Sequence, residues 1–279
     1  MDTITILEFL AAPIVASLII AGIHAYLGLH VVERGVIFVD LSLAQIASLG
    51  ATIATLIPAF GGEPHSGGVY WMSLLFTLVG ALIFSLVKSQ RAKIPQEAII
   101  GITYAVASAA VVVVMSKAPG EAEHLRDMLV GNILSVQWEE VRHTALVYLV
   151  IAVFHYLCRR QFLEISMDPA GAQARGVRVR LWDFLFYASF GLVVTRSVAI
   201  AGVLLVFCYL IVPSVGGMLF SSRIGPRLAI GWTMGAIVSM LGMYFSVLFD
   251  LPTGATIVCT FGLALIVMAL AKTIRFGRA

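Results

Sequence analysis

The chain has 279 residues, of which 60% are hydrophobic and only 12% are charged, with a formal net charge of +3. Soluble domains carry about 25% charged residues, so this composition and the mean hydropathy of +1.00 exclude a water-soluble globular protein. Because each membrane-spanning helix needs about 20 apolar residues, most of the chain is committed to the bilayer, as one domain over residues 1–279.

Nine apolar segments predict nine membrane-spanning helices in an all-α, polytopic bundle. The stretch from Trp182 to Phe220 is too long for one span, and we expect it to break in two at Thr195-Arg196-Ser197. If either half re-enters the membrane without crossing it, eight spans remain. The predicted spans cover residues 5–28, 36–58, 69–87, 97–116, 142–158, 183–196, 198–220, 228–249 and 253–271.

The distribution of basic residues predicts the orientation of the chain. Cytoplasmic loops carry the excess of Lys and Arg in membrane proteins. If the loop from Arg159 to Arg180 is cytoplasmic, fourteen of the eighteen Lys and Arg residues lie inside, whereas the opposite orientation places fourteen outside. We therefore expect an external N-terminus and a cytoplasmic C-terminus.

Two connections between the spans are long enough to have a structure of their own. The external connection, about 117–142, repeats apolar residues at helical spacing and predicts a short amphipathic helix. In the internal connection, about 159–181, Asp168-Pro169 suits a helix start and Gly176 suits a helix end. A helix of about two turns is marginal in water by itself, so we expect the bundle or a soluble partner to hold it.

Small residues recur along the eighth predicted span. Gly231 and Gly235 are four residues apart, a spacing that lets two helices approach closely. The contact is either packing within the chain or an interface between subunits.

Asp40 stands alone in an apolar run from Gly35 to Gly50. A charged residue at the centre of a membrane helix costs about 2.5–3.5 kcal/mol even by insertion-based estimates, and it usually faces the bundle interior or a water-filled path. Asp40 therefore indicates a translocation path, which Ser42 and Gln45 would also line. The alternative is that Asp40 lies near a helix end and reaches water or neighbouring backbone.

The sequence lacks the motifs of common catalytic sites. It has no G-x-x-x-x-G-K-[ST] phosphate loop, so the chain should not hydrolyse ATP, and it has no H-E-x-x-H or G-x-S-x-G motif. Asp40 is the one acid that we expect deep in a span, because Glu97 and Asp250 lie near span ends. We expect a protein that is not an enzyme and holds no permanent cofactor.

Several segments, in order along the chain, resemble the permease subunits of zinc, manganese and iron ABC importers, the ABC-3 family. The segment from Glu97 to Gly101 is similar to the family's E-x-x-I-G-I motif, and the run from Gly202 to Pro213 resembles a later one. The coupling segment of the family, D-P-x-x-A-x-x-x-G, is similar to the stretch that contains Asp168, Pro169, Ala172 and Gly176.

The resemblance implies a fold, a location and a set of partners. It implies a type II ABC importer-like homodimer, surrounded by lipid in the bacterial inner membrane, that carries a divalent metal, zinc or manganese first. Two ATPase subunits would bind the ATP and dock on residues 168–176, and a solute-binding protein would dock outside. No nucleic acid is expected as a partner.

The expected metal gate departs from the family pattern. The second span of the family carries an Asp and a His four residues apart, on one helix face, which suits a transition metal. Here Ala44 stands at the His position when Asp40 is aligned, and Gln45 stands there when Gly50 is aligned. His24 in the first predicted span is a candidate partner for Asp40; the alternative is a histidine that only packs.

Two other functions fit parts of the sequence. The loss of the usual ligand pair also suits an ABC importer permease for a metal chelate or a small organic molecule. A secondary transporter or an intramembrane enzyme is a third hypothesis. Many secondary transporters contain internal repeats, and the sequence has no convincing one.

Overall fold

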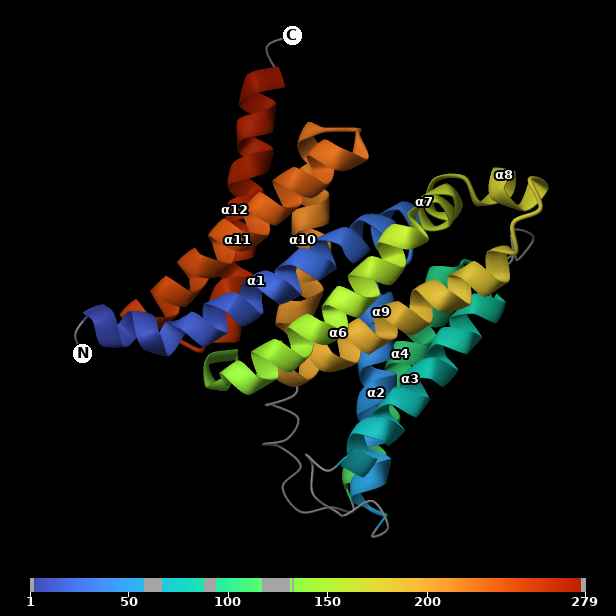
Figure 1. Ribbon diagram of the computed structural model, residues 1–279, viewed down its shortest axis with the longest axis horizontal. Coiled ribbons are helices and arrows are strands. Elements are labelled where there is room, and N and C mark those ends of the chain that lie inside the picture. The colour runs from blue at the N-terminus through green and yellow to red at the C-terminus, as the bar shows by residue number, and fades with distance from the viewer. Residues whose placement is uncertain (1–2, 58–66, 88–93, 117–130, 132, 277–279) are drawn as a thin grey trace. The chain divides into compact units, whose positions relative to one another are not determined.

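The computed structural model describes residues 3–57, 67–87, 94–116, 131 and 133–276, and over these ranges the chain is helical with no β-strand (Figure 1). The predicted all-α fold is confirmed. The helices are α1 (Thr3–Arg34), α2 (Val39–Thr55), α3 (Gly67–Val87), α4 (Gln96–Met115), the 3-10 helix η2 (Ile133–Ser135), α6 (Trp138–Leu157), α7 (Arg159–Met167), α8 (Pro169–Ala174), α9 (Val179–Ala201), α10 (Val203–Phe220), α11 (Ile224–Phe249) and α12 (Thr253–Phe276).

Each of the nine predicted spans coincides with a helix. Within the described ranges seven helices, α1, α3, α4 and α9 to α12, are long and apolar enough to cross a membrane by themselves. An eighth candidate is α6 with α7, which meet at a bend of 71°. The remaining helix, α2, is apolar but has only 17 residues, or about 26 Å of helix.

The long apolar stretch breaks several residues later than predicted. α9 continues through Thr195, Arg196 and Ser197 to Ala201, because a single Arg does not interrupt helical hydrogen bonding. The break falls at Gly202, whose φ of +77° is a left-handed conformation that favours glycine. The expected two helices are present, with one residue between them.

The predicted external helix falls mainly on residues outside the described ranges. Between 117 and 142 the structure describes only η2, the residues beside it and the first turn of α6. The amphipathic helix itself therefore stays a prediction.

The chain divides into two compact units. The first unit comprises Met1–Val32, Asp127–Ala152 and Ala199–Ala279, and the second comprises Glu33–Arg126 and Val153–Val198. The boundaries fall inside α1, α6 and α9, so each of these helices contributes to both units. The expectation of one permease domain stays a prediction.

Glycine lets two helix backbones touch in the first unit. A Cβ atom at Gly28 of α1 would collide with the carbonyl oxygen of Leu210 in α10. Beside it, the Ser214 hydroxyl of α10 donates to the carbonyl of Ala25 in α1 (3.3 Å). Close packing of this kind holds helices together in lipid, where the hydrophobic effect between helices is absent.

The small residues of α11 also pack inside the first unit. A Cβ atom at Gly231 would lie 3.1 Å from the carbonyl oxygen of Pro213 in α10, and one at Gly235 would lie 3.4 Å from the Cβ of Ala21 in α1. Of the two alternatives for this pair of glycines, the structure therefore has packing within the chain.

In the second unit, α2 packs between α3 and α4. A Cβ atom at Gly50 would lie only 2.8 Å from the carbonyl oxygen of Met72, so α2 and α3 approach closely. The hydroxyls of Thr77 in α3 and Thr195 in α9 are hydrogen-bonded at 3.0 Å. α2, which carries Asp40, is therefore enclosed by neighbours on two sides.

Gly28→Ala is expected to destabilise the protein by about 1–3 kcal/mol, because the new methyl group forces two backbones apart. The matched control is Gly22→Ala on the same helix, where an added Cβ meets nothing within 4 Å. Thermal unfolding of the purified protein in detergent measures both. Equal Tm values for the two variants would show that the backbone contact is absent.

Candidate functional site

Asp40 lies in the first turn of α2 and is only 1% exposed. The N–H groups of Asp40 itself and of Leu41 lie near its carboxylate, but within the described chain neither oxygen makes a hydrogen bond of ordinary geometry. Asp40 thus lies near a helix end, as the alternative interpretation held, yet it is buried and does not reach water. A buried carboxylate with unsatisfied oxygens has capacity for a cation or a proton.

Glu97 brings a second carboxylate to the start of α2. It lies in the first turn of α4, and its Oε1 atom accepts a hydrogen bond from the backbone N–H of Phe38 (3.0 Å), the N-cap residue of α2. Its Oε2 atom is buried and has no partner among the residues described. The charge of Glu97 also acts on Asp40. The sequence marked Glu97 only as a motif residue, and its place beside α2 is new.

Ser42 and Gln45 are both buried in α2 but do not share a helix face with Asp40. At about 100° per residue they lie roughly 200° and 140° around the helix from it. The Ser42 hydroxyl has no hydrogen-bond partner in the part of the chain that is described. An undistorted α2 therefore cannot offer all three predicted path residues to one ion.

His24, the predicted partner of Asp40, is fully buried in α1. Its Nδ1 atom lies 2.8 Å from the carbonyl oxygen of Ile20. Because a carbonyl only accepts, Nδ1 carries the proton and Nε2 keeps the lone pair that a metal would bind. Nε2 has no hydrogen-bond partner among the described residues.

The pairing of His24 with Asp40 stays a prediction. His24 belongs to the first unit and Asp40 to the second. Over the described ranges, no group of three or more His, Cys, Asp or Glu side chains is arranged to hold a metal ion. A metal site built only from these described residues would therefore need fewer protein ligands of these types, or other donors.

The predicted coupling segment contains the expected short helix, α8. Asp168 is its N-cap, with Oδ1 accepting a hydrogen bond from the Gly171 N–H (2.8 Å), and Pro169 occupies the first turn. A Cβ atom at Gly171 would collide with the Asp168 carboxylate. A small residue at position 171 therefore allows the cap to close.

The other end of α8 is a Schellman motif. Gly176 has a φ of +84°, and its N–H donates to the Gln173 carbonyl, while the Val177 N–H donates to the Ala172 carbonyl, both at 3.0 Å. The Ala172 side chain is fully buried. The six-residue helix is thus closed at both ends and packed through one small side chain.

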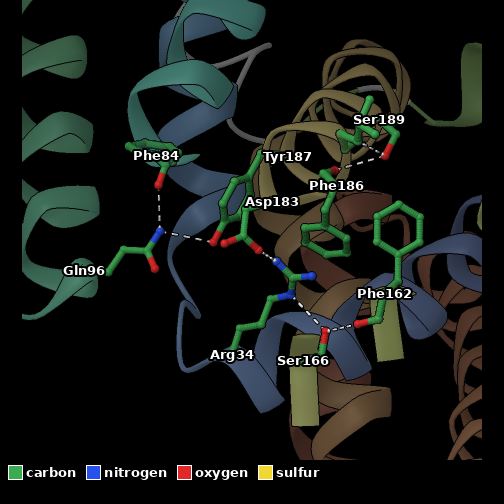
Figure 2. Close-up of polar contacts among 10 residues, drawn as sticks. Arg34, Phe84, Gln96, Phe162, Ser166, Asp183, Phe186, Tyr187 and Ser189 are labelled. Carbon is green, nitrogen blue, oxygen red and sulfur yellow. Dashed lines mark hydrogen bonds and ion pairs between the residues drawn. The ribbon is translucent and has the colours of Figure 1, made fainter. Parts of the chain in front are cut away.

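Arg34 and Asp183 form a buried ion pair that the sequence did not reveal (Figure 2). Their side chains are 1% and 0% exposed, and Arg34 Nη1 lies 2.5 Å from Asp183 Oδ1. Arg34 Nε also donates to the Ser166 hydroxyl (2.9 Å), and its Cζ atom lies 4.1 Å from the centre of the Phe186 ring. Asp183 is the first residue of the predicted span 183–196 and lies near the start of α9, so the expectation that Asp40 is the one acid deep in a span stays a prediction. The sequence gives one indication of this pair. Arg34 follows the first predicted span and Asp183 begins the sixth, so both are expected at the cytoplasmic side of the membrane.

Pro213 and Gly101, the other two residues of the family-like motifs, differ in their packing. Pro213 is buried inside α10 at the contact with Gly231. Gly101 lies in α4, and a Cβ atom there would meet nothing within 4 Å, so no packing contact explains this glycine.

Asp168→Ala is expected to open α8, since loss of an N-cap costs about 0.5–2 kcal/mol and the helix has only six residues. Hydrogen exchange of the peptide covering 168–176 should become faster by about 2- to 30-fold. Asp168→Asn retains a capping oxygen and should exchange like the wild type. Unchanged exchange in Asp168→Ala would show that the cap does not hold α8.

Comparison with known proteins gives consistent matches over nearly the whole chain. The model of the ABC 3 transport family matches residues 6–272. The manganese transport system membrane protein MntC of Halalkalibacterium halodurans is 26% identical over 258 residues, which cover 92% of this chain and 85% of that protein. The manganese import system permease protein ScaB of Streptococcus gordonii is 25% identical over 266 residues, with 93% and 90% covered.

A solved structure has the same fold. PsaBC from Streptococcus pneumoniae, determined in complex with Fab, matches with a TM-score of 0.76 and 22% sequence identity. The match covers 95% of this chain and 93% of that chain. At this identity the likeness shows the fold alone.

Proposed function

The chain belongs to the ABC 3 transport family, and from this we propose that it is the membrane-spanning permease of a bacterial importer for divalent transition-metal ions. The observation that carries the proposal is the family match from residue 6 to residue 272. Relatives named for manganese transport make manganese the first candidate. Zinc, the other metal that the resemblance of the sequence implies, is the second. A permease of this family is a transport protein, not an enzyme.

The donor chemistry at the start of α2 supports manganese over zinc. The donors there are the carboxylates of Asp40 and Glu97, and Ala44 or Gln45 stands where the family pattern has a histidine. Carboxylate and carbonyl oxygens suit Mn²⁺, whereas imidazole and thiolate suit Zn²⁺. His24 is the candidate for a single nitrogen donor.

Asp40 is the proposed path residue. A buried, uncompensated carboxylate is costly in an apolar interior, and a passing cation offsets that cost. Glu97 holds the N-cap residue of α2 and adds negative charge at the same end. The two carboxylates together would attract a cation to this end of the helix.

The proposed partners follow from the segments that lack a function within the chain. We infer that α8 docks an ATPase subunit, because the chain has no phosphate loop of its own and α8 is a preformed, capped element. The permease would act as a homodimer, with a solute-binding protein docked outside. In the inner membrane the N-terminus would be external and the C-terminus cytoplasmic.

Asp40→Asn is expected to lower manganese uptake at least tenfold, since the lost charge is worth more than about 1.4 kcal/mol to a bound cation. Uptake is measured in proteoliposomes that contain the permease, its co-purified ATPase and its binding protein. The control is Asp250→Asn, the same chemical change at an exposed residue at the end of α11, and it should transport like the wild type.

Three results would count against parts of this proposal. Normal uptake by Asp40→Asn would remove Asp40 from the path. A wild-type complex that responds to no divalent ion would favour a metal chelate or a small organic molecule as the substrate. Uptake that continues without ATP, driven by an ion gradient, would favour a secondary transporter.

A further inference from the structure

The coupling segment is connected to the interior of the second unit through α7. Arg175, at the end of α8, donates to Glu164 of α7 (2.5 Å). Two residues further along α7, the Ser166 hydroxyl donates to the carbonyl of Phe162 (2.8 Å) and accepts from Arg34 Nε (2.9 Å). A displacement of α8 therefore reaches Arg34 through one short helix.

Arg34 also contacts α9. Its guanidinium group binds Ser166 through Nε and Asp183 through Nη1, so a single planar group contacts α7 and α9 together. It also lies over the ring of Phe186, one turn along α9 from Asp183 (Figure 2). Because both charges are buried, neither can replace its partner with water.

Tyr187, which follows Phe186 in α9, is connected to α3 and α4 through Gln96. The Nε2 atom of Gln96 donates both to the Tyr187 hydroxyl (3.2 Å) and to the carbonyl of Phe84 in α3 (3.0 Å), as Figure 2 shows. The Arg34 Cζ atom lies 5.9 Å from the Tyr187 ring centre. Gln96 is the first residue of α4, so α9 is bonded to the start of that helix.

The last contact in this set joins α4 to the start of α2. Glu97 follows Gln96 directly in α4 and accepts the hydrogen bond from the Phe38 backbone, two residues before Asp40. A continuous set of contacts thus runs from α8 through α7, the end of α1, α9 and α4 to the start of α2, all of it inside the second unit.

We propose that Arg34, Asp183, Tyr187 and Gln96 are positioning residues through which the coupling segment sets the start of α2 and therefore Asp40. The inference rests on the proposed function, because it assumes that an ATPase moves α8. Buried polar groups that have found partners separate only at a large cost. A shift of α7 is therefore transmitted to α9 and α4, and it is not absorbed by exchange with water.

Tyr187→Phe tests the link by removing a single oxygen atom. The ring stays, with its edge contacts to Phe84 and Phe186, so the fold should be kept and Tm should change little. The quantity to measure is manganese transported per ATP hydrolysed by the reconstituted complex. We expect this ratio to fall by about 2- to 10-fold, the equivalent of one hydrogen bond.

The matched control is Tyr209→Phe in the first unit. Tyr209 is also fully buried, and its hydroxyl is hydrogen-bonded to Ser17. It lies outside the proposed link, so the transport-to-ATP ratio of this variant should equal that of the wild type. An equal fall in both variants would attribute the loss to general packing and overturn the inference.

A double-mutant cycle with Ser166→Ala tests whether the two ends of the link act together. If they do, Ser166→Ala, Tyr187→Phe and the double variant lower the ratio by similar factors. Factors that multiply would overturn the inference. A wild-type complex without manganese-dependent transport would defeat the proposed function, whereas a coupled wild type with an equally coupled Tyr187→Phe would defeat only the positioning link.

Discussion

The second unit depends on one buried ion pair, between Arg34 and Asp183. Removing one partner from a pair of this kind costs about 3–5 kcal/mol, because the other charge is left without compensation in an apolar place. Here the same guanidinium group also holds Ser166 and covers the ring of Phe186. The end of α1, α7 and α9 can therefore separate only at that cost, and they are expected to move as one body.

Features that depend on neighbouring residues could be predicted from the sequence. Hydropathy located nine helices, and Asp168, Pro169 and Gly176 located α8, since caps and left-handed turns are set by a few adjacent residues. The helix break was misplaced for a related reason. Arg196 interrupts the hydropathy but not the backbone hydrogen bonds, whereas Gly202 changes the backbone conformation itself.

Contacts between distant segments could not be predicted in the same way. Arg34 and Asp183 are 149 positions apart, and a count of basic residues treats Arg34 only as a charge on the cytoplasmic side. Likewise, Glu97 resembled a family motif, but its bond to Phe38 follows from the packing of α4 against α2. A single sequence does not say which helices are neighbours. The burial of Asp40 could be predicted because the cost of a carboxylate in lipid depends on its own segment alone.

On the proposed path along α2, the length of this helix affects the barrier that a cation would meet. Its 17 residues extend about 26 Å, less than the roughly 30 Å of a hydrocarbon core, while the longer helices α3 and α4 pack against it. α3 and α4 can match the thickness of the lipid while α2 stays short. For a cation on the proposed path along α2, the protein then sets the length of the low-dielectric region that the cation crosses. This length does not change with the chain length of the lipid.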